Sequence, residues 1–102
     1  MNTEIINEET VLTVIPEGHL DSITSDDFNV AIESKLEGVT QLVLDFSKVD
    51  YISSKGIRVI LMYNQKMKSC GKMVMKNLNP AVYEVFRLSG LLDVLEILKN
   101  DK

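Results

Sequence analysis

Two adjacent serines, Ser53 and Ser54, stand where a polar segment gives way to an apolar pattern at helical spacing. A serine there lies at a helix N-terminus, where unpaired backbone N–H groups and the helix dipole favour negative charge. Lys55 and Arg58 add positive charge beside it, with Arg58 one helical turn from Ser54. The Ser54 hydroxyl could therefore carry a phosphate that the fold tolerates. The residues alone leave open whether Ser54 is such a site or only the N-cap of the helix.

Nucleophilic catalysis is a second chemistry to consider, because His19, Asp21 and Ser54 formally supply a base, a carboxylate and a nucleophile. No G-x-S-x-G pattern surrounds the serine, which makes a hydrolase the weakest hypothesis. Cys70 is the single cysteine, so no intramolecular disulfide can form, and the Cys/His spacing of a zinc site is absent. The sequence predicts no catalytic residue, no metal site and no cofactor.

The length and composition restrict the class of protein. The chain has 102 residues, 45% of them apolar and 25% charged, which is typical of one soluble globular domain over residues 1–102. The formal net charge of -4 disfavours nucleic acid as a partner. The N-terminus lacks the features of a signal peptide, and no apolar run reaches the ~18 residues of a membrane span. We expect a cytoplasmic protein without membrane insertion.

Apolar periodicity and turn residues divide the chain into strands and helices. Thr24 and Asp27 have the spacing of a capping box for the first helix, and Gly38 is expected to end it. Asn79 supplies an N-cap before Pro80 for the third helix, and Gly90 ends it. The expected strands are residues 4–7, 11–15, 41–46, 73–75 and 94–98, and the expected helices begin at residues 24, 54 and 80. A helix over residues 91–95 is an alternative for the last element.

This order of elements predicts an α/β fold with a mixed, mostly parallel sheet and three to four helices. Strand–helix–strand units from residue 41 onward require parallel strands, and the first two strands add an antiparallel hairpin at the edge. Functional groups of open α/β sheets gather at the carboxyl ends of parallel strands. The loops expected there are residues 19–24, 47–54 and 76–79, which would bring Asp21, Ser54 and Asn77 to one docking face.

Several segments together resemble STAS domains, the family that contains the anti-sigma factor antagonists of bacteria. The resemblance rests on residues 43–46, 49–52 and 54–57 (VLDF, VDYI and SKGI), and on residues 18–21, 79–82 and 88–91 (GHLD, NPAV and LSGL). These segments cover nearly the whole chain. Their ordered combination is more specific than any single one.

The resemblance implies a regulatory binding module that is not an enzyme. In this family an anti-sigma factor kinase phosphorylates a serine at the start of the second helix, and the unphosphorylated form binds that kinase and releases sigma factor. A phosphatase could reset such a switch. The matching phosphoacceptor is Ser54, with Ser53 as the alternative. The partner-binding residues that the resemblance and the expected docking face imply are Asp21, Ser22, Ser53, Ser54, Lys55, Gly56, Arg58 and Asn77.

The neighbours of Ser54 also keep a second function open. Ser53 and Lys55 stand where the family usually has an aspartate and a small residue. The alternative is a STAS interaction subunit of a larger signalling or lipid-transport complex, in which phosphorylation plays no part.

Overall fold

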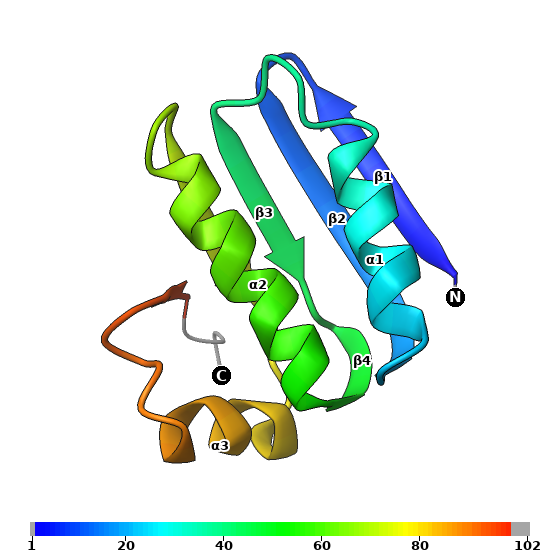
Figure 1. The fold of residues 1–102 in the computed structure, drawn as a ribbon, viewed down its shortest axis with the longest axis vertical. Coiled ribbons are helices and arrows are strands. Elements are labelled where there is room, and N and C mark those ends of the chain that lie inside the picture. The colour runs from blue at the N-terminus through cyan, green and yellow to red at the C-terminus, as the bar shows by residue number, and fades with distance from the viewer. Residues whose placement is uncertain (1, 99–102) are drawn as a thin grey trace.

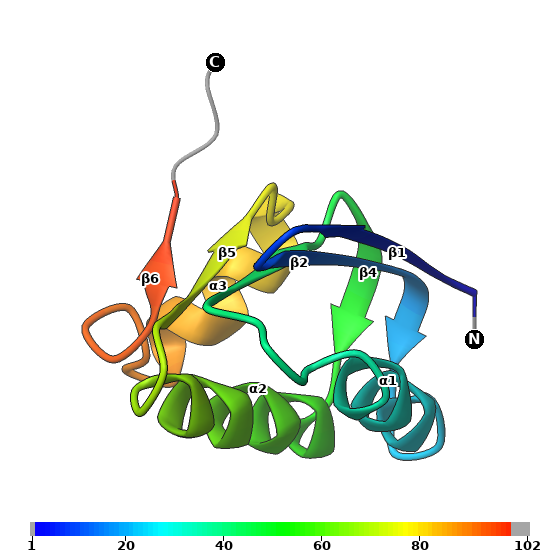
Figure 2. The same cartoon turned by 90° about the horizontal axis from the view of Figure 1, so that it is seen from above.

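The protein alternates strands and helices along the chain, and a computed structural model describes residues 2–98. Its elements are β1 (Thr3–Glu8), β2 (Val11–Leu20), α1 (Thr24–Glu33), β3 (Gln41–Asp45), β4 (Lys48–Ile52), α2 (Ser54–Met67), β5 (Lys72–Lys76), α3 (Pro80–Leu88) and β6 (Glu96–Ile97). The sheet order is β1-β2-β3-β5-β6, and β4 also pairs with β2. Helices α1 and α2 lie side by side on one face of this sheet (Figures 1 and 2).

The strand directions confirm the predicted fold class. Strand β1 pairs antiparallel with β2 and forms one edge of the sheet, as the predicted hairpin requires. All the other strand pairs are parallel. The protein is therefore a mixed, mostly parallel α/β domain with three helices among its described residues.

Strand β2 is longer than predicted, because it changes partner halfway along its length. Its first half pairs with β3, and its second half, up to Leu20, pairs with β4. Pro16 lies between the two parallel pairings, where its missing N–H removes no bond to either partner. The predicted strand end at Ile15 is therefore wrong.

Strand β4 (Lys48–Ile52) occupies most of the loop that was predicted over residues 47–54. The register between β2 and β4 shifts after Gly18, so that Gly18 faces Val49 while His19 faces Tyr51. This bulge turns both Val49 and Ile52 towards the core, although they are three positions apart. The two-residue alternation of an ordinary strand is lost, which explains why the sequence pattern did not indicate β4.

The core lies between the sheet and the helices. Strand β3 is buried along its centre, as its continuous apolar run predicted. Phe28 of α1 packs edge-on against Phe46, with ring centroids 6.2 Å apart. Helix α2 buries Tyr63 completely, which was not predicted, whereas Ile57 and Leu61 are only partly buried.

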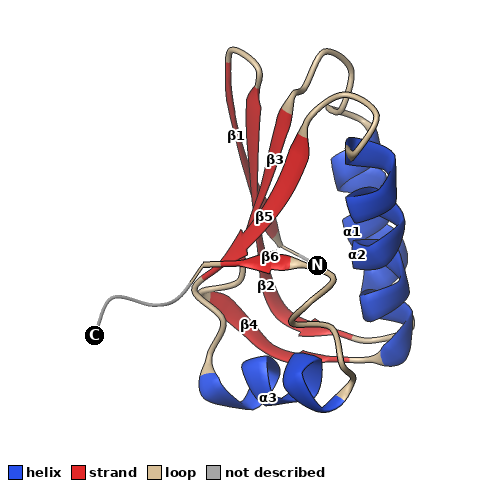
Figure 3. Cartoon of the chain, turned by 90° about the vertical axis from the view of Figure 1, so that its left-hand side faces the viewer, coloured by secondary structure: helices blue, strands red, loops and turns tan. Residues whose placement is uncertain are grey.

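Helix α3 packs against β4 at one end of the molecule (Figure 3). Its predicted cap is confirmed, because Asn79 Oδ1 accepts a hydrogen bond from the backbone N–H of Val82 at 2.8 Å. Gly90 has a φ of +74°, as the predicted helix end requires. The last predicted strand shrinks to the two residues of β6, and residues 91–95 form turns and no helix. No helix within residues 2–98 has the length and apolar character to cross a bilayer.

Candidate functional site

The first turn of α2 lies beside the carboxyl ends of β2 and β4. The backbone N–H of Ser53 donates to the carbonyl of Leu20 at 2.8 Å, which adds one bond beyond the last β2–β4 residue pair. This bond holds Ser53 in an extended conformation with ψ 172°, and the helix begins with the next residue. The end of the strand pair therefore fixes the start of α2.

The two serines have different environments as a result. Ser53 is the N-cap, and its half-buried side chain accepts a hydrogen bond from the backbone N–H of Gly56 at 3.3 Å. Ser54 is the first helical residue; its side chain is exposed and makes no hydrogen bond within residues 2–98. The alternative that Ser54 is only the N-cap is wrong, because the bond to Leu20 places the cap one residue earlier. The Ser54 hydroxyl is left without a hydrogen bond to any residue that the structure describes.

Gly56 permits a close approach between α2 and the segments around it. A Cβ atom at this position would lie 2.9 Å from Ile52 Cγ1 and 3.3 Å from both the Leu20 carbonyl oxygen and Ser25 Oγ. Gly56 is buried, so it offers no side chain or exposed surface to a partner. Its contribution is to hold the first turn of α2 against α1 and β2.

Asp21 builds the turn that connects β2 to α1. Its carboxylate accepts hydrogen bonds from the backbone N–H groups of Thr24 and Ile23, both at 2.9 Å, and these bonds hold the pKa of Asp21 below its usual value. The Thr24 hydroxyl donates to the carbonyl of His19, 2.5 Å away. The predicted capping box of Thr24 and Asp27 is therefore wrong, because Asp21 satisfies the first N–H groups of α1 and Thr24 bonds back to the strand.

The same turn exposes Ser22 and Ile23 beside the start of α2. Ile23 is 76% exposed, which is unusual for a large apolar side chain in a short turn. Ile23 was not among the residues predicted to bind a partner. The signal that could have found it is an isoleucine within a polar segment, where no helix or strand pattern needs an apolar residue.

Two cationic residues lie close to Ser54 in the sequence, and they differ in whether they form an ion pair within residues 2–98. Lys55 reaches across to α1, where its Nζ lies 2.9 Å from Asp26 Oδ1. Arg58 is exposed and has no ion pair within the described part of the chain. Residues four apart share a helix face and adjacent residues do not, so Arg58 lies on the face of Ser54. Among residues 2–98, Arg58 is thus the unpaired cation next to the serine.

Asn77 is not brought to this site. Its side-chain amide donates to Asp45 Oδ1 at 3.1 Å, where β3 and β5 end. Although burial opposes the change, this bond and one from the backbone N–H of Ser47 hold the pKa of Asp45 below its usual value. Strand β4 then runs for five residues, roughly 16 Å at ~3.3 Å per residue, before Ser54 is reached. The expectation that Asn77 shares a face with Asp21 and Ser54 is therefore wrong.

The residues of the considered catalytic triad do not meet. His19 Nδ1 lies 2.5 Å from Asp50 Oδ1, and the His19 ring packs edge-on against Tyr51. The Asp21 carboxylate is occupied by its own turn, and the Ser54 side chain contacts neither residue through a hydrogen bond. Within residues 2–98, no group of three or more His, Cys, Asp or Glu side chains could hold a metal ion.

The fold and the site together define a small α/β module that presents a free serine at the start of its second helix. The chain belongs to the STAS domain family, whose model matches residues 2–101. A protein of Bordetella bronchiseptica that is named as the anti-sigma factor antagonist BtrV is 31% identical over 86 residues, which cover 82% of this chain and 74% of BtrV.

Solved structures agree on the fold. The anti-sigma factor antagonist SpoIIAA in its unphosphorylated form has a TM-score of 0.83 at 18% identity, with 99% of this chain and 90% of that chain covered. The Bacillus cell-fate determinant SpoIIAA in its phosphorylated form has a TM-score of 0.76 at 17% identity, with 99% and 93% covered. These likenesses concern the arrangement of strands and helices.

Proposed function

We propose that this protein is an anti-sigma factor antagonist that is switched off by phosphorylation of Ser54. In its unphosphorylated form it binds an anti-sigma factor of the serine/threonine kinase type in the cytoplasm and thereby releases a sigma factor. The similarity to BtrV and to SpoIIAA, which has been solved in unphosphorylated and phosphorylated forms, supports this function. The observation that carries the proposal is the exposed hydroxyl of Ser54 at the first helical position of α2, which makes no hydrogen bond within residues 2–98.

The environments of the two serines favour Ser54 over Ser53 as the acceptor. A kinase must bring the hydroxyl to the γ-phosphate of ATP, which requires an accessible side chain. Ser53 is half-buried, and its oxygen already bonds to the N–H of Gly56, so its phosphorylation would disrupt the cap. Ser54 is exposed and can be modified without the loss of any observed bond.

A phosphate on Ser54 would be tolerated by the fold. Phosphorylation adds about -1.5 to -2 charges at pH 7, which the N-terminus of α2 and the exposed Arg58 can offset. Lys55 is already paired with Asp26, so it contributes less. The partner, in contrast, would meet a charged group where it had bound a neutral hydroxyl, and this charge would have to be desolvated in the interface. Binding falls while stability is retained.

The accessible residues around Ser54 define the surface that we propose for the partner. This docking surface consists of the exposed residues Ser22, Ile23, Ser54 and Arg58 and of the half-buried Lys55. Ile23 supplies the apolar anchor that interfaces need at their centre, and the remaining residues supply a polar rim. Asp21, Ser53 and Gly56 shape the surface through the turn, the cap and the close helix approach.

The experiment that tests the function uses a purified kinase-type anti-sigma factor with ATP and Mg²⁺. We expect one phosphate, which mass spectrometry of peptides assigns to Ser54, and no phosphate on the Ser54→Ala variant. Ser53→Ala is the matched control and remains a substrate. A phosphatase should restore binding to the phosphorylated protein. A phosphate on Ser53, or a stable complex with no modification, would contradict the switch, and the latter would favour the interaction-subunit alternative.

The docking surface is tested separately by Ile23→Ser. Because the Ile23 side chain is 76% exposed, its replacement should leave the melting temperature unchanged. Binding to the anti-sigma factor should weaken by at least tenfold in titration calorimetry, since a buried anchor is worth more than ~1.4 kcal/mol. Val30→Ser, at an exposed apolar position two turns along α1, is the control that should bind normally. Equal binding by all three proteins would rule out Ile23 as the anchor.

A further inference from the structure

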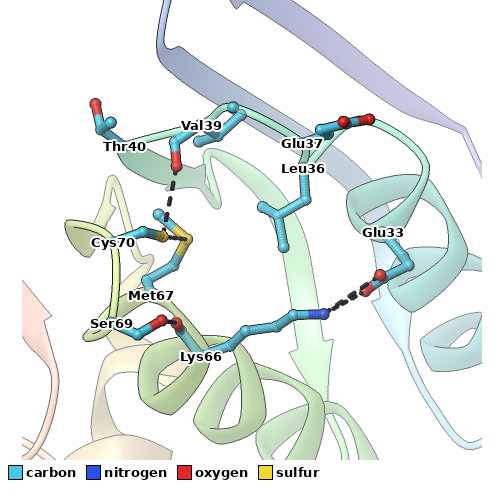
Figure 4. Close-up of a pocket in the computed structure, with 10 residues that line it drawn as sticks. Glu33, Leu36, Glu37, Val39, Thr40, Lys66, Met67, Ser69 and Cys70 are labelled. Atoms are coloured by element: carbon cyan, nitrogen blue, oxygen red, sulfur yellow. Dashed lines mark hydrogen bonds and ion pairs between the residues drawn. The ribbon is translucent and has the colours of Figure 1, made fainter.

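A groove opens at the opposite end of the α1–α2 pair from Ser54. It lies between the end of α1, the loop that leads to β3, and the end of α2 (Figure 4). Its volume is about 530 Å³, within the range of about 300–1,000 Å³ that is usual for small-molecule sites. Helix α2 has 14 residues, so the groove lies roughly 20 Å along the helix axis from Ser54 at ~1.5 Å per residue. The groove is therefore separate from the docking surface.

Three apolar side chains are among the residues that line the groove. Leu36 points into the open space, and Val39 and Met67 lie around it (Figure 4). Val39 is 4% exposed and Met67 is fully buried, so both are held in place by the core. Leu36 is partly buried and packs against the same core. Leu36 therefore offers an apolar contact to a ligand, and Val39 and Met67 belong to the fixed core behind it.

The charged groups of the groove favour a cationic ligand. Lys66 Nζ lies 3.1 Å from Glu33 Oε1, so this lysine is already neutralised. The hydrogen bonds from Lys66 and Tyr63 hold the pKa of Glu33 below its usual value, which keeps Glu33 ionised. Glu37 is exposed on the rim and has no ion pair within residues 2–98. The groove therefore carries one uncompensated negative charge.

We propose that this groove binds small, mainly apolar molecules that carry one ammonium or guanidinium group. The apolar part packs against the partly buried Leu36, and the cationic group lies at the rim with Glu37. A ligand with a carboxylate would find no unpaired cation among the described residues that line the groove, because Lys66 is held by Glu33. The ligand is selected by its charge as well as by its shape.

The test uses three fragments of one size, which differ in charge, and backbone amide chemical shifts of the ¹⁵N-labelled full chain. The fragments are 3-phenylpropylamine, 3-phenylpropanol and 3-phenylpropanoate. We expect saturable shifts in residues 33–40 and 66–70 with the amine, at a millimolar dissociation constant that is usual for a fragment of about ten heavy atoms. The alcohol should bind at least threefold more weakly, and the carboxylate at least tenfold more weakly.

A matched pair of variants tests the role of Glu37. Glu37→Lys should weaken amine binding at least fivefold. Glu4→Lys, at an exposed position on β1, changes the net charge equally and should leave binding unchanged. A thermal melt confirms that both variants are folded. The proposal is overturned if the amine causes no saturable shift in these residues, if the three fragments bind equally, or if Glu37→Lys binds the amine like Glu4→Lys.

Discussion

Helices α2 and α3 both begin with a polar N-cap residue in an extended conformation, yet their first helical residues differ. Helix α2 continues from Ser53 with Ser54, whose hydroxyl is exposed and unbonded. Helix α3 continues from Asn79 with Pro80, which has neither a hydroxyl nor an N–H. Asn79 also donates from Nδ2 to the carbonyl of Val49 at 3.1 Å, so this cap joins α3 to β4.

The start of α3 has a structural role, whereas the start of α2 has a structural role and also presents a residue that can be modified. Both polar ends of the Asn79 side chain are bonded inside the protein, which leaves nothing for a partner. At the start of α2 the two roles fall to different residues. Ser53 stabilises the helix as its N-cap, and the exposed hydroxyl of Ser54 is accessible for phosphorylation. Substitutions at the two helix starts should therefore affect stability and function differently.

The largest loss of stability is expected for Asn79→Ala. This change removes the cap, worth ~1 kcal/mol, and leaves the buried Val49 carbonyl without a partner, at ~1–2 kcal/mol. Denaturant unfolding should show a decrease of about 2–3 kcal/mol in the free energy of unfolding. Asn79→Ser, which retains a cap oxygen, should lose less, and both variants should be phosphorylated normally. A loss below about 0.5 kcal/mol for the alanine variant would contradict the structural role of this cap.

A smaller loss is expected for Ser53→Ala. Only one hydrogen bond, from the N–H of Gly56, is removed, so the free energy of unfolding should decrease by ~1 kcal/mol. Denaturant titration measures the change, and Ser53→Asp, which can cap, is the control that should remain stable. If Ser54→Ala were the more destabilised of the two alanine variants, our assignment of the cap would be incorrect.

Almost no loss of stability is expected for Ser54→Asp. The negative charge lies at the N-terminus of α2 on the face of Arg58, so the free energy of unfolding should stay within about 0.5 kcal/mol of the parent value. Thermal unfolding and circular dichroism measure this, with Ser54→Ala as the neutral control. Binding to the anti-sigma factor should decrease for the aspartate variant. A melting temperature lowered by several degrees, or altered secondary structure, would show that the switch acts through the fold.

A small, pH-dependent effect on stability is expected for Asp21→Asn, at a half-buried position. The folded-state pKa of Asp21 is lowered, so its contribution to stability is present above the usual aspartate pKa, ~3.9, and is lost as the pH falls through the lowered value. Asp21→Asn should therefore be slightly less stable than the parent at pH 7, and the two proteins should converge in acid. Melting temperatures from pH 7 to pH 2 provide the measurement. A difference that grows in acid would contradict the role of the charged carboxylate.

The elements that the sequence predicted correctly have complete local signals. Asn79, Pro80 and Gly90 mark both ends of α3. The continuous apolar run of β3 indicates burial on both faces without any knowledge of its neighbours. In each case the information lies within a few residues, so the wider fold cannot change it.

The elements that were missed depend on distant partners. The second half of β2 is a strand because β4 pairs with it. In β4 a bulge interrupts the alternation of buried and exposed residues that would mark a strand in the sequence. The cap of α1 was assigned to Thr24 from its spacing, but the strand end at His19 takes the Thr24 hydroxyl and leaves the role to Asp21. Tyr63 was missed because its buried hydroxyl needs Glu33 and Asn29 on α1, 30 and 34 positions away.

The sequence by itself determined the α/β class, the family, and a serine pair at the start of the second helix, because periodicity and turn chemistry are local properties. It could not decide between Ser53 and Ser54, which are equally good caps by residue type. The tertiary structure made that choice through the bond from Ser53 to Leu20, which belongs to a strand 33 positions earlier. The pairing of β2 with β4 also separates Ser54 from Asn77. These two strands continue beyond the ends of β3 and β5, where Asn77 lies, and Ser54 follows the far end of β4.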